Sequence, residues 1–258
     1  MRHQAVTRFG LWALFFVLAC QGGEKSAPAE PAPASAQAGS PAKPDEPAEA
    51  SKKKPAPAAV PDSLPSGLLL SYSQFQVVDG KATAKPGPAR LDILTREGGA
   101  WKTETVEDAQ SNVFHKAMLL TPRGQAPGIL TLGGSGAYVK LWRRVKGKLR
   151  PTTLWQAEFG GKFNRMRDAE VADLYGDGTP AIAVATHDQG VVAVLRQNVK
   201  KWKVERIDKK NDTFVHEIEI GDLDQDGTLE VYATPSEPNK MDGTPQPGKV
   251  VRYVPAKG

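Results

Sequence analysis

Residues 216–234 read HEIEIGDLDQDGTLEVYAT, and this pattern predicts a strand, an acidic loop and a second strand. Asp222, Asp224 and Asp226 place three carboxylates at alternate positions of the loop. Gly227 follows them and permits a tight turn. Oxygen ligands spaced in this way can surround a hard cation such as Ca²⁺. Apolar residues alternate with polar ones on both sides, which indicates strands rather than the helices that flank an EF-hand loop.

The predicted ligand set extends beyond these three aspartates. Thr228 and Glu230 follow in the same loop, which then reads D-x-D-x-D-G-T-x-E. A related loop contains Asp173 and Asp177, but Tyr175 stands between them where the first loop has its second acid. We expect the first loop to bind Ca²⁺ in a structural role. The alternative is a polar turn, and in the second loop an Asp-Gly turn alone explains both acids.

The acidic loop belongs to an internal repeat. Residues 173–179 align with residues 222–228 at an offset of 49, and residues 115–132 align with residues 167–184 at an offset of 52. Each unit is predicted to contain four short strands, and no segment after the N-terminal apolar run shows helical periodicity. Four-stranded units that recur about every 50 residues predict an all-β fold, a β-propeller.

These units resemble FG-GAP/VCBS repeats, the calcium-loop propeller blades that also form the head of integrin α chains. The resemblance covers residues 115–254, with a poorer first unit at 66–110. It implies a propeller domain over residues 65–258, with Ca²⁺ as its structural cofactor. About four units fit in the chain, whereas propellers of this family usually have six or seven blades.

The low number of units leaves two arrangements open. The last predicted strand, residues 250–254, is not followed by a fourth strand of its unit. The propeller is then incomplete, and its open edge favours self-association. Alternatively, a strand near residues 68–72 completes the final unit and closes a four-bladed ring.

The N-terminal region predicts export and a lipid anchor. A basic start and an apolar run are typical of a signal peptide over residues 1–19. It ends Val-Leu-Ala-Cys, which resembles a bacterial lipobox, so Cys20 is predicted to be acylated. Gln21 after this cysteine resembles the signal for the outer membrane. The alternative is ordinary secretion of a protein whose only cysteine is unpaired.

Residues 20–64 predict a disordered tether between the membrane and the propeller. Ala, Pro, Lys, Glu and Ser dominate this segment, and it contains no aromatic residue. Such a composition cannot bury enough apolar surface to order the chain. The whole chain has a formal net charge of +5, which is a weak basic balance. Together with the export signal, this balance argues against nucleic acid as a partner.

Three basic side chains occupy the same position in successive units. His115, Arg167 and His216 each lie six residues before the first position of an A–B loop, the loop that joins the first two strands of a unit. In a propeller the first strand of each blade lines the central channel, so these residues predict a ligand or metal site near the axis. The alternative is a recurring residue that bonds a neighbouring blade. His187 is interpreted as a solvated loop residue.

These features predict a non-enzymatic binding module that is anchored by a lipid and stabilised by calcium. Its ligand would be a protein or glycan of the cell envelope. The sequence contains no nucleophile elbow, P-loop or zinc-protease motif. One alternative is a propeller enzyme that acts on polysaccharide, as a lyase or dehydratase. Another is an incomplete propeller without independent function.

The lipid anchor gives a first testable prediction. Cys20→Ala should leave uncleaved precursor, because the thiol that accepts the lipid is missing. We expect wild-type protein in the membrane fraction and a larger, unlipidated form of the variant, separated by electrophoresis after fractionation. Normal processing of the variant together with undiminished membrane retention would contradict acylation at Cys20.

Overall fold

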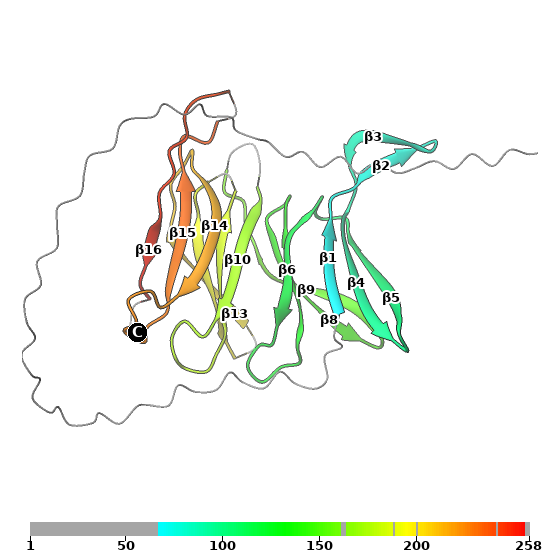
Figure 1. Ribbon diagram of the computed structural model, residues 1–258, viewed down its shortest axis with the longest axis horizontal. Helices are drawn as coiled ribbons and strands as arrows, with labels where there is room; N and C mark the ends of the chain where they lie inside the picture. Colours follow the sequence, from blue (N-terminus) through cyan, green and yellow to red (C-terminus); the bar gives the residue numbers. More distant parts are fainter. Residues whose placement is uncertain (1–66, 161–163, 188, 200, 241, 256–258) are drawn as a thin grey trace, which may run out of the picture. The chain divides into compact units, whose positions relative to one another are not determined.

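The computed structural model describes residues 67–160, 164–187, 189–199, 201–240 and 242–255. The predicted signal peptide, Cys20 and the tether therefore lie outside the described residues. The described part is all-β, with sixteen strands and no helix (Figure 1). It accordingly contains no helix that is long and apolar enough to cross a membrane. The all-β prediction is confirmed.

The strands form four antiparallel sheets and one separate hairpin. The first sheet contains β1 (Gly67–Tyr72), β4 (Ala89–Glu97) and β5 (Ala100–Asp108), and the hairpin contains β2 (Phe75–Val78) and β3 (Lys81–Pro86). The second sheet contains β6 (Phe114–Leu120), β7 (Gly128–Gly133), β8 (Tyr138–Val145) and β9 (Lys148–Gln156). The third contains β10 (Met166–Ala172), β11 (Ala181–Thr186), β12 (Val192–Asn198) and β13 (Lys201–Asp208). The fourth contains β14 (Phe214–Gly221), β15 (Glu230–Ser236) and β16 (Val251–Tyr253).

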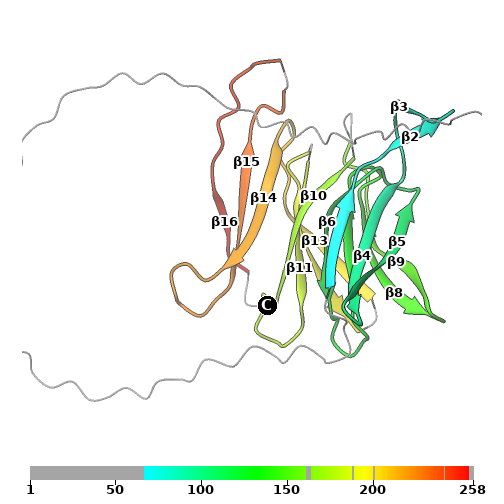
Figure 2. The ribbon, with the colours of Figure 1, turned by 45° about the vertical axis from the view of Figure 1, so that its right-hand side comes forward.

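The sheets correspond to the units of the sequence repeat. The second and third sheets are complete four-stranded meanders, which confirms the predicted unit. β6, β10 and β14 are the first strands of successive units, and we call them the A strands. β10 contacts both β6 and β14, so that consecutive sheets stand side by side in sequence order (Figures 1 and 2). Closure of the sheets into a ring stays a prediction.

Three apolar clusters hold consecutive sheets together. The cluster between the second and third sheets includes Leu132 and Ile182, and the cluster between the third and fourth includes Ala183 and Ile218. A smaller cluster around Leu91 joins the first sheet to the second. Burial from two sides explains why β7 and β11 are apolar without alternation, since every side chain of these strands is buried. The sequence run over residues 181–185 therefore reflects sheets on both faces.

One buried ion pair also joins the first two sheets. Lys140 on β8 is only 2% exposed, and its ammonium group lies 2.6 Å from the carboxylate of Asp108 at the end of β5. It also donates a hydrogen bond to Gln110. A charge in such a place requires partners, because an unpaired buried ammonium group is costly.

The N-terminal strand does not complete the last unit. β1 pairs with β4 in the first sheet, with Leu70 opposite Asp92. The fourth sheet ends at β16, which pairs only with β15 in the described part of the chain. Residues 68–72 therefore belong to the first sheet, where one edge of the strand pairs with β4, and they do not complete the last unit in the described part of the chain, which corrects the expectation that they seal a small ring.

The edge of β1 opposite β4 is unpaired among the described residues, and the strand carries exposed apolar side chains. Leu68, Leu70 and Tyr72 are 51%, 38% and 40% exposed. Since an open strand edge can pair with another chain, we expect the full chain to self-associate through β1. Light scattering over a range of concentrations should report species larger than a monomer.

Leu70→Lys should shift this equilibrium toward the monomer, because a charged residue on an edge strand opposes pairing. Val145→Lys on β8 is the control, since Val145 is also an exposed apolar strand residue, at 53% against 38% for Leu70. A wild-type chain that stays monomeric at every concentration would contradict the prediction, as would equal effects of the two substitutions.

Candidate functional site

The acidic loop joins β14 to β15, and its own hydrogen bonds shape it. The Gly227 amide donates to Asp222 Oδ2 at 3.0 Å, and the Thr228 amide donates to Asp226 Oδ1 at 2.7 Å. Gln225 and Gly227 have φ angles of 60° and 85°. Glycine takes such a φ without strain, which explains its place at the turn.

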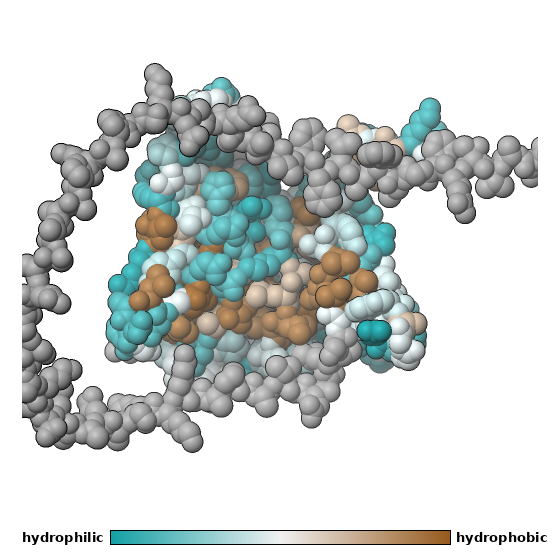
Figure 3. Space-filling view, in the orientation of Figure 1, coloured by the Kyte–Doolittle hydropathy of each residue, from teal (hydrophilic) through white to brown (hydrophobic). Residues whose placement is uncertain are grey.

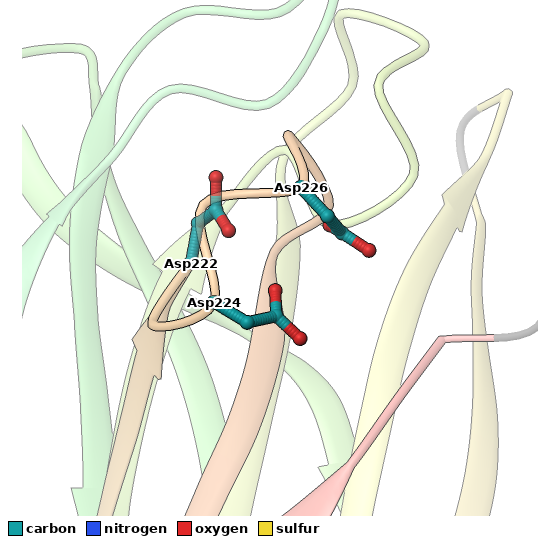
Figure 4. A group of neighbouring side chains, drawn as sticks. All are labelled: Asp222, Asp224 and Asp226. Atoms are coloured by element: carbon teal, nitrogen blue, oxygen red, sulfur yellow. The ribbon is translucent and has the colours of Figure 1, made fainter. Parts of the chain in front are cut away.

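Three of the predicted ligands converge in this loop. Asp222, Asp224 and Asp226 each offer a carboxylate oxygen within 4.8 Å of the others (Figure 4). Asp222 Oδ1 is buried and has no hydrogen-bond partner in the described part of the chain. An all-oxygen donor set with an unsatisfied buried acceptor fits a hard cation such as Ca²⁺. Asp222, Asp224 and Asp226 are therefore the residues that would hold the ion.

Glu230 is not one of these three converging carboxylates, and Arg252 binds it. Its side chain is fully buried and accepts hydrogen bonds from Arg252 on β16 and from the Tyr232 hydroxyl, the latter at 3.1 Å. Arg252 also pairs with Asp224. The hydrogen bonds to Glu230 and Asp224 raise the pKa of the Arg252 guanidinium. The arginine thus neutralises two of the predicted calcium ligands, and Thr228 contributes a backbone amide to the loop.

The second acidic loop is closed by internal contacts. Both carboxylate oxygens of Asp173 accept backbone amides, from Asp177 at 3.0 Å and from Gly178 at 2.8 Å. Asp177 pairs with Arg196 at 2.8 Å, and this hydrogen bond is the main cause of its lowered pKa. Among the described residues, a group of three potential metal ligands occurs only in the first loop. The contacts of Asp173 and Asp177 are those of the Asp-Gly turn alternative.

The three equivalent basic residues lie at the other end of the A strands. Their side chains form a row with two aromatic rings, and we call this group the His–Arg cluster: His115, Arg167, His187, Phe214 and His216. The His115 and His187 rings stack with centroids 6.5 Å apart. The centroid of the Phe214 ring lies 4.0 Å from the ring centroids of both His187 and His216. The Arg167 guanidinium lies 5.7 Å from the centroid of the same Phe214 ring.

Each of the two flanking histidines also has a polar partner. His115 Nδ1 donates to the Met166 carbonyl oxygen at 2.5 Å, which requires the proton on Nδ1. His216 Nε2 lies 2.9 Å from the Ser236 hydroxyl. Partial burial of the rings lowers the pKa of both imidazoles, and the positive charge of Arg167 lowers it further. Both rings are thereby kept neutral at pH 7.

A chain of titratable groups runs beside the His–Arg cluster, one residue further along each A strand. Lys116 pairs with Asp168 at 2.9 Å, and Asp168 accepts the Ile218 amide at 3.0 Å. Burial alone would raise the pKa of Asp168, but these two partners hold it below its usual value. Glu217 shares a hydrogen bond with Asp168, and burial followed by this contact raises the pKa of Glu217.

The face formed by the A strands reflects this arrangement. Figure 3 shows hydrophilic residues over the upper part of β6, β10 and β14 and a hydrophobic band below them. A pocket of about 630 Å³ adjoins the cluster, lined by His216, Ser236 and Lys249 among others. A second pocket of about 640 Å³ lies between the two acidic loops and is lined by Asp173 and Asp226.

His187 lies in the loop after β11, as expected, but it is half-buried rather than fully solvated, because its ring is stacked within the cluster. His187 directly follows the buried strand β11. In an antiparallel unit the end of this strand lies beside the start of the A strand. This pairing could have predicted from the sequence that His187 lies near the basic residues of the A strands. Phe214 offered no comparable signal, since the alignment of the units gives it no equivalent aromatic residue.

Comparison with models of known protein families finds no match, and comparison with curated proteins finds none.

The acidic loop yields a prediction about calcium. Millimolar Ca²⁺ should raise the melting temperature of the full chain above its value in chelator, because an ion that binds only the folded state stabilises it. A free Ca²⁺ concentration of about 100 times the Kd would raise the free energy of unfolding by about 2.7 kcal/mol. Asp222→Asn should abolish most of this shift, since it removes a carboxylate that is not bonded to Arg252.

Arg252→Gln provides a second arm of the same experiment. Without its guanidinium, the buried Glu230 loses its counter-ion and Asp224 is released. We expect a lower melting temperature in chelator and a larger increase on addition of Ca²⁺. Arg196→Gln is the matched control, because Arg196 on β12 pairs with Asp177 of the other acidic loop. A calcium shift that persists unchanged in Asp222→Asn would rule out this loop as the site.

Proposed function

We propose that the chain is a non-enzymatic binding module of the bacterial cell envelope. A lipid on Cys20 would anchor it to the outer membrane, and the folded domain would bind a protein or a glycan at the His–Arg cluster. The observation that carries the proposal is the convergence of His115, Arg167 and His216, which come from three different sheets. Residues that meet only in the folded chain, at one end of rigid strands, are well placed to form a recognition surface.

The position of the acidic loops supports different roles for the two ends of the sheets, calcium binding at one end and ligand binding at the other. The loops follow the A strands, whereas the His–Arg cluster lies at the beginning of these strands. Calcium at Asp222, Asp224 and Asp226 would neutralise the repulsion of the three carboxylates and hold the β14–β15 connection. The ion would then act on stability, and the opposite end would be free to contact a ligand.

The exposure of the cluster favours binding over catalysis. His216 is exposed, and the pocket beside it opens to solvent. Catalysis of polysaccharide cleavage generally requires that reacting groups be held close together and shielded from water. An open surface with a few fixed polar groups suits recognition instead.

One observation favours the enzyme alternative, a propeller lyase or dehydratase. The Asp168 and Glu217 carboxyl groups share a hydrogen bond, and their pKa values move in opposite directions. Such a pair can provide an acid and a base. The neutral imidazoles of His115 and His216 could likewise accept a proton.

A panel of immobilised envelope glycans and envelope proteins tests both candidates. We expect the full chain to bind at least one member and to release no reducing or unsaturated ends from any polysaccharide. The paired substitution Arg167→Gln and His216→Gln should reduce binding at least about tenfold, a loss of 1.4 kcal/mol. Arg196→Gln at the other end of the sheets should leave binding unchanged.

Each alternative has its own signature in this experiment. Product release that is lost in Glu217→Gln would establish the enzyme. Absence of any binding, by a chain whose melting curve is cooperative, would favour an incomplete propeller without independent function. Binding that is equal in wild type and the paired variant would place the ligand elsewhere.

A further inference from the structure

Arg167 lacks a counter-ion in the described part of the chain, although its Nε atom is buried. Several other arginines of the sheets have carboxylate partners, such as Arg144 with Glu104 and Arg196 with Asp177. Arg167 Nε has no hydrogen-bond partner, and the guanidinium lies near the Phe214 ring. A guanidinium group stays charged and offers five N–H donors, so a guanidinium without an anionic acceptor has unused capacity to bind one.

The groups that surround Arg167 reinforce its positive charge. Arg165, Arg167 and His187 all oppose protonation of His115, and Arg167 and His187 oppose protonation of His216. A bound anion would remove this repulsion and would permit the imidazoles to donate to it. A metal ion fits less well, since the three histidines do not bring their nitrogens together as a ligand group.

The carboxylates on the same face already have partners other than Arg167. Asp168 is buried and holds Lys116 and the Ile218 amide, and Glu217 is hydrogen-bonded to Asp168. Glu170 pairs with Lys116. Glu217 acts on Arg167 electrostatically, but no carboxylate in the described residues forms an ion pair with this guanidinium.

Basic loops extend the surface beyond the cluster. Lys210 and Lys249 converge on the single carboxylate of Glu237, and Lys249 also lines the pocket beside His216. Two lysines that share one carboxylate leave positive charge for a further anion.

We infer that the ligand of the His–Arg cluster carries an oxyanion group, a carboxylate, sulfate or phosphate, and that Arg167 binds it while His115 and His216 flank it. The inference names the chemical class of the ligand and rests on the proposed function of this site. The partner is thus an anionic ligand, and neutral polymers without such a group are excluded.

Sulfate is a suitable first probe, because it stays fully ionised while the histidines titrate. The full chain with His3→Gln retains only the three cluster imidazoles, which can be followed by NMR. Sodium sulfate should shift their resonances saturably and raise the pKa values of His115 and His216. Sodium chloride at equal ionic strength should not. Affinity should increase as the pH falls below about 6.5, the usual pKa of an imidazole, because the pKa values of both rings are lowered and protonated imidazoles attract the anion.

Arg167→Gln should weaken sulfate binding at least about tenfold, a difference of 1.4 kcal/mol. Arg167→Lys keeps the charge without the planar donor fork and should retain part of the affinity. Arg196→Gln is the matched control and should behave as wild type. No saturable shift in a folded chain, or equal affinity in wild type and Arg167→Gln, would overturn the inference.

A second arm separates the inference from the function on which it rests. Polygalacturonate and its neutral methyl ester differ only in the carboxylate. Preference for the acid form, lost in Arg167→Gln, supports the inference for a polymeric ligand. Equal binding of both polymers leaves the binding function standing and overturns the anion class. Sulfate binding at Arg167 without binding of either polymer supports the oxyanion site and counts against an acidic glycan as its ligand.

Discussion

The carboxylate of Asp168 is the contact on which the arrangement of the sheets depends. It is buried in the third sheet, receives Lys116 from the second sheet and accepts the Ile218 amide from the fourth. One side chain therefore sets the spacing of three A strands. A buried carboxylate tolerates little displacement of its partners, because each lost hydrogen bond leaves a charge without compensation. The apolar clusters supply the bulk of the packing, and this contact gives it a defined register.

This register also determines what the A strands present at their two ends. The residues immediately before Lys116, Asp168 and Glu217 are the three basic members of the His–Arg cluster, so the ionic chain brings the cluster together. At the other end the same strands lead into the A–B loops. Identical repeats would place identical groups at each end, and the divergence of the units produces a basic end and a partly acidic one.

The two acidic loops illustrate how neighbouring contacts alter the chemistry of similar sequences. In one loop Asp177 is neutralised by Arg196. In the other, Arg252 reaches Asp224 and the buried Glu230, while Asp222 keeps a buried oxygen without a partner. The first contact occupies the available carboxylate, whereas the second leaves a buried oxygen of Asp222 without a partner beside the carboxylates of Asp224 and Asp226. Arginines on the neighbouring strands therefore decide how many ligands each loop can offer.

The sequence by itself determined the all-β fold through period-2 alternation, and the four-stranded units through the spacing of the repeat. The loop pattern with its Asp-Gly turn determined the grouping of Asp222, Asp224 and Asp226. These features depend on residues close together in the chain. The sequence also aligned His115, Arg167 and His216. It could not place Arg252 on Glu230, His187 beside Phe214, or β1 next to β4. Those contacts join residues far apart in the chain, and only packing of the sheets decides which side chains meet there.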